Sequence, residues 1–356
     1  MNSSNHRVAI ITHPLQYNYG GVLQAFALST VLSRICEEVV ILQNFSYTVK
    51  EYVKLCWEQI QPFHRFKHKY LSEIHVSFER LEEYLQRMHI DTVVVGSDQV
   101  WRPGFAMKNY TFGQFLTGRV PINLLAYAAS FGTDDWEYTD KQEIFLQKEI
   151  LKFSNISVRE DSGCNLCKKH LGVEAQLVVD PTLLLEDAFY LNLIKGKKKN
   201  DFKECFCYLL DSDNLFNERV IRAVIDNLNL NLRQVSLIKN RMLKRFLPTL
   251  SIPDWLAGIY NADFVITDSF HGCIFCILFK KNFLVLENVR GGNARIESLL
   301  RLFRIENRLI RQGEMLNLNN LPVIDWSIVD EILKEQREKS YSFLMGAMNI
   351  KYDTCR

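Results

Sequence analysis

The sequence predicts an α/β fold made of two Rossmann-like domains that face each other across a cleft. Two observations lead to this prediction. Short apolar runs typical of buried parallel strands alternate with segments of helical periodicity, and this alternation occurs in two separate blocks. With 356 residues the chain is also too long for one ordinary core, so two domains of about 150 to 180 residues each are expected.

The first block, residues 1–190, is expected to form the N-terminal domain. Val8–Thr12 is its first predicted strand, and apolar residues between Val22 and Ile35 recur with helical spacing. Tyr47–Met88 is predicted to be helical and irregular. The other predicted strands are Val39–Gln43, Thr92–Val95, Leu124–Ala128, Asn155–Val158 and Gln176–Asp180, and the other predicted helices are Thr139–Phe153 and Glu160–His170.

A linker is predicted over Glu186–Asp201, before a second α/β domain over residues 200–325. Residues 326–356 are expected to form a long helix and tail that pack back on the N-terminal domain. The predicted strands are Cys205–Leu210, Leu232–Leu237, Phe264–Thr267 and Phe283–Leu286, and the predicted helices are Asn217–Asn227, Pro253–Tyr260, Ile274–Phe279, Ile296–Phe303 and Trp326–Met345.

Composition excludes several classes of protein. A net charge of +2 gives no strong field, so no nucleic acid partner is expected. The sequence shows neither a secretory signal nor a run of about 18 apolar residues, so a cytoplasmic protein is expected. The run Lys195–Lys199 is typical of a solvated linker, the alternative being a patch that touches anionic lipid at the inner face of the membrane.

Two cysteine pairs, Cys164-x-x-Cys167 and Cys273-x-x-Cys276, have the spacing of metal ligands. Structural zinc sites usually take such pairs from turns, whereas the second pair lies in the apolar stripe of a predicted helix. No metal site is therefore expected, and the cysteines are interpreted as reduced, buried thiols.

Polar residues gather where predicted strands end, which is where ligands of open α/β sheets bind. Asp268-Ser269-Phe270-His271-Gly272 follows a buried strand and begins a helix, so Ser269, His271 and free backbone N–H groups meet at one point. A helix N-terminus suits an anion, and a histidine there can handle protons. The alternative is a histidine that only caps or packs.

The other candidates each have two readings. Asn18-Tyr19-Gly20-Gly21 either lets the backbone approach a ligand or makes a tight turn. Asp98 either accepts a hydrogen bond from a sugar hydroxyl or holds a helix start, and Trp101 either stacks on a sugar ring or packs. Arg159 either binds a carboxylate or phosphate or pairs with Glu160 or Asp161. Arg290 and Arg295 bracket a glycine-rich loop that suits a polyanion, the alternative being a solvated loop.

Together these motifs resemble the polysaccharide pyruvyl transferase family over nearly the whole chain. The segments that carry the resemblance are N-Y-G-G-V-L-Q-A (18–25), V-G-S-D-Q-V-W (95–101), Y-A-A-S-F-G (127–132), I-S-V-R-E (156–160), D-P-T-L-L (180–184), N-A-D-F-V-I-T-D-S-F-H-G (261–272) and R-G-G-N-A-R-I (290–296). The resemblance implies a GT-B-like fold and transfer of a pyruvyl group from phosphoenolpyruvate to a sugar, commonly as a cyclic ketal.

The resemblance also implies roles for residues. His271 is the expected acid/base or phosphate-contacting residue, Arg159 the carboxylate or phosphate clamp, and Arg290 or Arg295 a further donor contact. Ketal-forming members often carry an arginine two residues before this histidine; here that position is Ser269, which leaves open whether the donor is the same.

We therefore expect a transferase acting on a bacterial capsule or exopolysaccharide precursor, with phosphoenolpyruvate as co-substrate and no other cofactor. The acceptor is expected to be a saccharide, with a polyprenyl-linked form and peripheral membrane contact as extensions. Ser269, Gly272 and His271 are assigned to the donor, and Asn18–Gly21, Asp98 and Trp101 to the acceptor. A GT-B glycosyltransferase that uses a nucleotide sugar and a non-catalytic binding protein are the alternatives.

Overall fold

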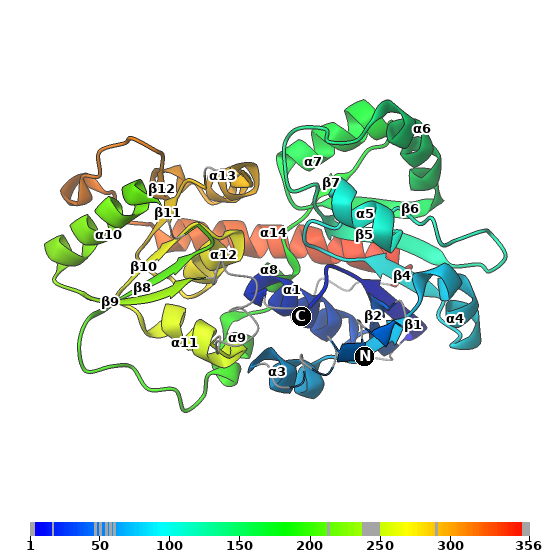
Figure 1. The fold of residues 1–356 in the computed structure, drawn as a ribbon, viewed down its shortest axis with the longest axis horizontal. Helices are drawn as coiled ribbons and strands as arrows, with labels where there is room; N and C mark the ends of the chain where they lie inside the picture. Colours follow the sequence, from blue (N-terminus) through cyan, green and yellow to red (C-terminus); the bar gives the residue numbers. More distant parts are fainter. Residues whose placement is uncertain are drawn as a thin grey trace. The chain divides into compact units, whose positions relative to one another are not determined.

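The computed structural model describes residues 4–15, 18–45, 48–49, 52–53, 56, 59, 62–211, 214–236, 250–288 and 291–350. The chain divides into two compact α/β units (Figure 1). Unit 1 comprises Met1–Leu185 together with Glu335–Arg356, and unit 2 comprises Glu186–Lys334. The boundary at residue 334 falls inside helix α14 (Trp326–Ala347), so that helix contributes to both units.

Unit 1 contains a parallel sheet whose order, in the described part of the chain, is β3-β2-β1-β4-β5-β6-β7. The order reverses between β1 and β4, which pair in register from Val8 with Thr92 to Ile11 with Val95. Every residue of β4 is buried, as expected of a strand covered on both faces. The strands are β1 (Ser4–Ile11), β2 (Cys36–Asn44), β3 (Glu73–Val76), β4 (Thr92–Val95), β5 (Asn123–Ala129), β6 (Phe153–Val158) and β7 (Gln176–Leu177).

Helix α1 (Tyr19–Leu32) follows the first strand of unit 1 and is buried along almost its whole length, which its apolar sequence permits. The second part of α14 also belongs to this unit. The remaining helices are α3 (Pro62–Tyr70), α4 (Leu81–Arg87), α5 (Pro103–Asn109), α6 (Asp140–Glu149), α7 (Asp161–Leu166) and α8 (Pro181–Leu184), with short 3-10 segments at Phe78–Arg80 and Ile150–Lys152 and a π-helical segment at Cys167–Leu171.

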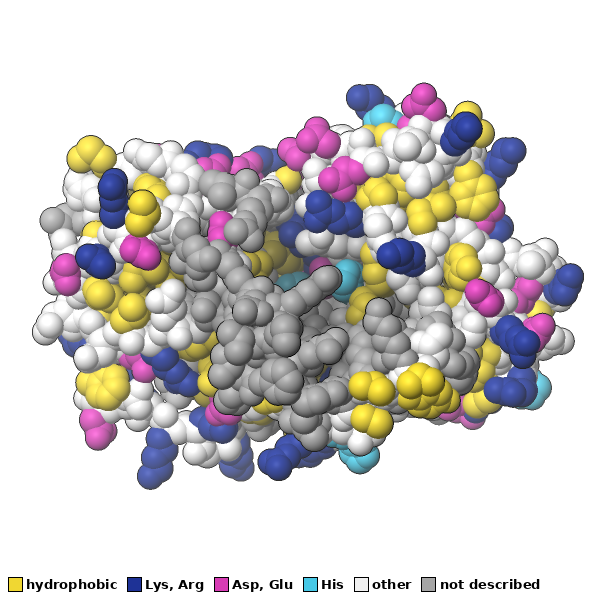
Figure 2. All heavy atoms as spheres, viewed as in Figure 1, with side chains coloured by type: hydrophobic (Ala, Val, Ile, Leu, Met, Phe, Trp, Pro, Cys, Tyr) yellow, Lys and Arg dark blue, Asp and Glu magenta, His cyan; other side chains and the backbone are white. Residues whose placement is uncertain are grey.

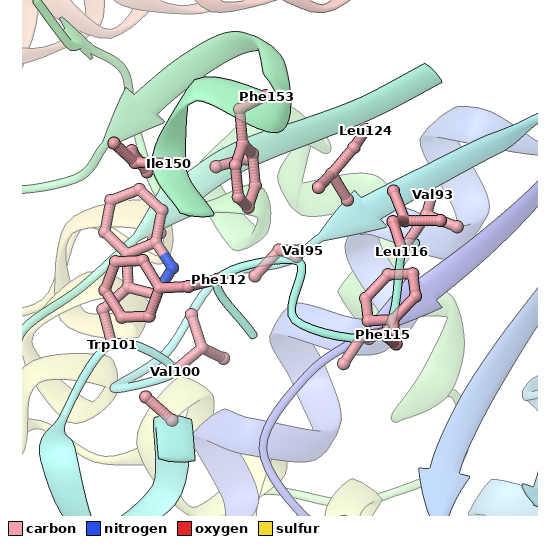
Figure 3. Packing of buried hydrophobic residues seen from close by; sticks show 14 of the residues in the cluster. Val93, Val95, Val100, Trp101, Phe112, Phe115, Leu116, Leu124, Ile150 and Phe153 are labelled. Atoms are coloured by element: carbon pink, nitrogen blue, oxygen red, sulfur yellow. The ribbon is translucent and has the colours of Figure 1, made fainter. Parts of the chain in front are cut away.

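The core of unit 1 combines strand residues with aromatic side chains from the segment after β4 (Figure 3). Trp101 and Phe112 stack with ring centroids 5.1 Å apart, and Phe153 meets the Trp101 ring edge-on. The indole Nε1 of Trp101 donates to the Thr111 carbonyl over 3.1 Å, so the polar atom of this fully buried ring has a partner.

Unit 2 contains a second parallel sheet, with the order β12-β11-β10-β8-β9 among the described residues. Here the order reverses between β8 and β10. The strands are β8 (Glu204–Leu209), β9 (Asn231–Ser236), β10 (Phe264–Thr267), β11 (Phe283–Leu286) and β12 (Leu309–Ile310), and the helices are α9 (Asp187–Leu193), α10 (Leu215–Leu228), α11 (Ile252–Asn261), α12 (Phe270–Leu278) and α13 (Asn293–Leu302), with 3-10 segments at Glu306–Arg308 and Leu318–Asn320.

Three predicted elements differ from the structure. The linker prediction for Glu186–Asp201 is wrong in its first part, because α9 (Asp187–Leu193) forms there around the buried Tyr190. The helical prediction for Tyr47–Met88 missed β3 (Glu73–Val76), a partly buried edge strand whose four residues are too few for their alternating pattern to be distinctive. The strand predicted over Gln176–Asp180 ends at Leu177, and Asp180 instead caps α8.

No helix within the described residues combines the length and apolar character needed to span a bilayer. In Figure 2, Lys and Arg side chains are interspersed with Asp and Glu over the described part of the visible face. This mixed surface agrees with the small net charge of +2.

Candidate functional site

Asp98 lies in unit 1 just after β4, where the strand order reverses. Its backbone φ is +80°, in the left-handed region that costs a non-glycine residue roughly 1 kcal/mol or more. Its Oδ1 accepts a hydrogen bond from the Gln99 backbone N–H over 2.9 Å, and its Oδ2 accepts one from Asn18 Nδ2 over 3.3 Å. Strained backbone persists where the surroundings fix it, and it gathers at functional sites.

Asn18 joins this carboxylate to the start of α1. Its side-chain oxygen accepts the Gly21 backbone N–H over 3.1 Å, which caps the helix. A Cβ on Gly21 would lie 3.0 Å from Asn18 Nδ2 and 3.4 Å from Asp98 Oδ2. Glycine at this position therefore lets the helix start approach both side chains. The neighbouring Tyr19 is buried and packs against Phe63, with ring centroids 4.8 Å apart.

Arg159 follows β6 and is engaged by acidic residues from other strand ends. Its Nη1 donates to Asp180 Oδ2 over 2.7 Å and to Ser97 Oγ over 3.1 Å, while its Nη2 donates to Asp98 Oδ1 over 3.3 Å. Its Nε lies 3.8 Å from Glu160 Oε2. The side chains of Arg159 and Asp180 have 0% exposure, so this is a buried ion-pair network.

The acidic neighbours of Arg159 keep its guanidinium protonated. Burial alone disfavours the charged guanidinium, but Asp180, Asp98 and Glu160 outweigh burial and raise the pKa of Arg159. Direct binding of a ligand by Arg159, as expected from the sequence, would require these bonds to be exchanged. The arrangement instead suits Arg159 to holding Asp98 in place. The alternative drawn from the sequence was an ion pair with Glu160 or Asp161. Glu160 is a partner at 3.8 Å, but the shortest ion pair is with Asp180, which the parallel sheet brings alongside.

Asp268 occupies the corresponding place in unit 2, after β10, where the order of the second sheet reverses. Its Oδ1 accepts the Leu210 N–H over 2.6 Å and its Oδ2 accepts the Asp211 N–H over 2.8 Å, both at the end of β8. Asn288, just after β11, places its Nδ2 3.4 Å from Asp268 Oδ2. One buried carboxylate thereby ties together the ends of three neighbouring strands.

Ser269 and His271 stand in the turn that begins α12. The Ser269 hydroxyl accepts the Gly272 N–H over 3.3 Å and so caps the helix. A Cβ on Gly272 would lie 2.4 Å from Thr267 Oγ1, so only glycine allows α12 to approach β10 this closely. The His271 side chain is 6% exposed, in the first turn of the helix, where backbone N–H groups and the helix dipole favour an anion.

Arg295 lies close to this turn. Its guanidinium carbon is 5.8 Å from the centre of the Phe270 ring, and that ring is 5.3 Å from the His271 ring. Gly292, with φ +90°, precedes α13, and a Cβ there would lie 2.8 Å from Arg295 Nη2. The left-handed φ favours glycine at position 292, and glycine also leaves room for the guanidinium of Arg295. Arg290, the other candidate arginine, lies outside the described residues.

The Asp268 carboxyl carries a testable pH dependence. Burial, together with the Asp211 carboxylate, raises the pKa of Asp268 from 3.8 to about 6, against the opposing effect of its backbone hydrogen bonds. A raised acid pKa means that the folded state retains the proton longer than the unfolded chain does. Protonated Asp268 therefore stabilises the folded state below about pH 4. As the pH rises through about 6, the free energy of unfolding falls by on the order of 3 kcal/mol.

The measurement is urea unfolding of the wild type and of Asp268→Asn between pH 4 and pH 7. Asparagine cannot ionise, so we expect the free energy of unfolding of the wild type to fall relative to that of the variant over this range. Parallel profiles would contradict the assignment.

A sequence model of the family described as polysaccharide pyruvyl transferase matches residues 18–288. The chain belongs to the polysaccharide pyruvyl transferase family. The match runs from Asn18 at the start of α1 to Asn288 beside Asp268, and so includes Asp98, Arg159 and His271 but not Arg295. Membership in the polysaccharide pyruvyl transferase family implies a transferase with a saccharide acceptor.

Solved structures similar to this pyruvyl transferase family member include UDP-N-acetylglucosamine 2-epimerases. A UDP-N-acetylglucosamine 2-epimerase has a TM-score of 0.58 at 11% identity, with 99% of each chain covered. The Neisseria meningitidis UDP-GlcNAc 2-epimerase bound to UDP-GlcNAc has a TM-score of 0.52 at 10% identity, covering 96% of this chain and 100% of that one. The Rickettsia bellii UDP-N-acetylglucosamine 2-epimerase has a TM-score of 0.52 at 12% identity, covering 97% and 98%.

At these identities the likeness shows the fold alone. It confirms the expected GT-B-like class, α/β with two Rossmann-like parallel-sheet domains. No curated protein sequence matches the chain.

The structure corrects one residue expected at the acceptor site of this pyruvyl transferase family member. Trp101 is fully buried in the core of unit 1, stacked on Phe112, so it packs and does not present its ring to a sugar (Figure 3). Asn18, Gly21 and Asp98 are brought together at the switch point of the first sheet, as are Ser269, His271 and Gly272 at the start of α12.

Sequence reasoning missed Ser97 and Asp211 as partners in these clusters. Ser97 directly follows the end of β4, and that position was its only signal. Asp211 lies after β8, a strand end for which no site was predicted. Among the described residues, no group of three or more His, Cys, Asp or Glu side chains is arranged to hold a metal ion. Burial raises the pKa of the Cys164 thiol to about 11.

Proposed function

We propose that the protein transfers a pyruvyl group from phosphoenolpyruvate to a galactose-type sugar of a bacterial capsule or exopolysaccharide precursor, forming a cyclic ketal. Family membership supports the transferase reaction and the saccharide acceptor. Phosphoenolpyruvate is the proposed donor and no other cofactor is proposed. We further propose that the acceptor is polyprenyl-linked and that the protein meets it at the inner face of the cytoplasmic membrane.

The observation that carries the donor assignment is the turn from Asp268 to Gly272. Phosphoenolpyruvate bears close to three negative charges, since the second phosphate pKa is about 6. The turn offers the N-terminus of α12, the Ser269 hydroxyl and the His271 imidazole, and Arg295 adds a cation beside Phe270. Helix N–H groups and a guanidinium suit phosphate and carboxylate oxygens.

The proposed reaction is balanced by one donor and two sugar hydroxyls. A proton adds to the methylene carbon of phosphoenolpyruvate, which makes C2 electrophilic, and a sugar hydroxyl attacks C2. The C2–O bond to phosphate then breaks, and the neighbouring hydroxyl closes the ketal. The two hydroxyls release two protons; one replaces the proton given to the methylene carbon and the other leaves on inorganic phosphate. His271 is proposed to supply and receive protons, or to hold the leaving phosphate.

Unit 1 is proposed to bind the acceptor. Asp98 is its candidate base, because the strained backbone and the hydrogen bonds from Asn18 and Gln99 fix the carboxylate at the switch point of the sheet. Arg159 is proposed to act on the reaction through Asp98, by orienting the carboxylate. Ser269 stands where ketal-forming members commonly have an arginine, so the donor site has one cation fewer. Arg295 is therefore proposed to be a main cationic contact of the donor.

The test is to incubate the purified protein with phosphoenolpyruvate and a galactose-containing acceptor and to measure released phosphate together with the mass of the acceptor. Ketal formation adds the mass of pyruvate less one water. Release of phosphate with that product supports the proposal. Turnover of a nucleotide sugar with no turnover of phosphoenolpyruvate would identify a glycosyltransferase. Binding of phosphoenolpyruvate without any turnover would indicate a binding protein.

A further inference from the structure

A hollow of about 650 Å³ opens in unit 1 and involves none of the residues assigned above. His13 contributes to it from the segment after β1, and Gln99, Arg102 and Phe105 contribute from the segment after β4, with Glu137 from a later loop. Its size lies within the range of ~300–1,000 Å³ usual for small-molecule sites.

The hollow lies at the place where α/β sheets bind ligands. β1 and β4 are the two strands between which the order of the first sheet reverses, and the hollow is lined by residues that follow both. Gln99, in its lining, donates its backbone N–H to Asp98 Oδ1 over 2.9 Å. A ligand in the hollow is therefore one residue along the chain from the candidate base.

One wall of the hollow contains two aromatic rings stacked on each other. The imidazole of His13 stacks on the ring of Phe105, with centroids 4.5 Å apart and 21° between the planes. Both rings are partly exposed, unlike the buried Trp101. The two rings cover one face of each other, and Phe105 also packs against the core of unit 1, so a sugar ring can lie only on an outer face of the pair, with one ring supporting the other.

The other wall is polar but internally neutralised. Arg102 donates from Nε and Nη2 to the two carboxylate oxygens of Glu137 over 3.2 and 3.4 Å, and from Nη1 to Gln99 Oε1 over 3.2 Å. The Glu137 side chain is 36% exposed and retains room to accept further hydrogen bonds. The wall thus offers donors and acceptors suited to hydroxyl groups, and Lys108, which also lines the hollow, adds one positive charge.

Gln99 is held in this wall by the loop that faces it. A Cβ on Gly132, which has a φ of +80°, would lie 2.8 Å from Gln99 Oε1. Glycine at position 132 therefore leaves the space that the glutamine amide occupies.

We propose that this hollow binds a saccharide ring, which lies against the stacked His13–Phe105 pair and is hydrogen-bonded by Gln99, Arg102 and Glu137. That the saccharide is the pyruvyl acceptor rests on the proposed function; that the hollow binds a sugar does not. The specificity for the acceptor is thereby assigned to residues separate from those proposed to contact the donor.

The test is saturation-transfer NMR on the full chain without any donor, with methyl β-galactopyranoside, methyl α-glucopyranoside, methyl α-mannopyranoside and methyl N-acetyl-β-glucosaminide as probes. We expect at least one glycoside to bind the wild type. Phe105→Ala should weaken that binding by about tenfold or more, and Phe105→Tyr, which keeps the ring, should restore it. Phe145→Ala removes an exposed phenylalanine of unit 1 outside the hollow and is the matched control.

Failure of all four glycosides to bind, equal binding by Phe105→Ala, or displacement of the glycoside by UDP alone would overturn the inference. Where phosphoenolpyruvate turnover is found, Phe105→Ala should raise the KM for the acceptor by about tenfold and leave the KM for phosphoenolpyruvate within about twofold. Sugar binding that depends on Phe105 without pyruvyl transfer would remove the donor assignment and keep this site.

Discussion

Replacing His271 with alanine is expected to lower kcat with phosphoenolpyruvate by roughly two or more orders of magnitude. The imidazole stands in the first turn of α12, beside Phe270 and close to Arg295, where it can exchange protons with the donor or hold its phosphate. Steady-state kinetics should separate the two roles. A fall in kcat with an unchanged KM for phosphoenolpyruvate indicates proton transfer, and a rise in that KM indicates phosphate binding.

His68→Ala is the matched control, because His68 is an exposed histidine on α3 of unit 1. Its kcat should equal that of the wild type. Circular dichroism should show that His271→Ala remains folded, since the side chain is small and its removal leaves a modest cavity. A folded His271→Ala protein with wild-type turnover would remove the histidine from the reaction.

Replacing Arg159 with methionine is expected to destabilise the protein by roughly 3–5 kcal/mol and to reduce turnover by two or more orders of magnitude. The guanidinium is buried and bonds Asp180 and Asp98, so its loss leaves carboxylates without their counter-charge in the interior. Turnover falls as well because Asp98 loses the group that orients it. Urea unfolding and phosphate release are the two measurements, and Arg119→Ala, at an exposed arginine of the same unit, is the control.

A double variant distinguishes loss of a charge network from simple loss of packing. Arg159→Met combined with Asp180→Asn removes one of the uncompensated carboxylates, so its urea midpoint should lie above that of Arg159→Met alone. Additive destabilisation by the two substitutions would show that the ion pair is energetically unimportant. A wild-type midpoint for Arg159→Met would contradict the burial of the pair.

The sequence predicted best those elements whose residues are buried on both sides. Thr92–Val95, Phe264–Thr267 and Phe283–Leu286 were predicted with the bounds that the structure has, because buried parallel strands are continuous apolar runs between polar turns. Two of the four edge strands in the described residues were missed. The half-buried β3 and the two-residue β12 have too few apolar residues to be distinguished from loops.

The sequence predicted where the candidate site residues lie along the chain, but not which of them contact one another. Strand ends identified Asp98, Arg159 and Asp268, since ligands of such sheets bind there. The pairing of Arg159 with Asp180 joins residues brought together by the order of strands, and spacing along the chain carries no record of that order. For the same reason the sequence could not show whether Trp101 is buried or exposed. Its burial depends on Phe112 and Phe153, which contact it only in the folded domain.

Unit 1 is built from two separate stretches of the chain, Met1–Leu185 and Glu335–Arg356, and this affects when it can complete folding during synthesis. The Val179 N–H donates to the Ser340 hydroxyl, Arg337 donates to the Leu183 and Leu185 carbonyls, and Tyr341 donates to the Leu184 carbonyl. Buried backbone groups need such partners, and these partners lie near the far end of the chain. During synthesis the strands of unit 1 leave the ribosome first. The backbone groups of residues 179–185 gain these partners only after residues 337–341 have also emerged, when all of unit 2 has been translated.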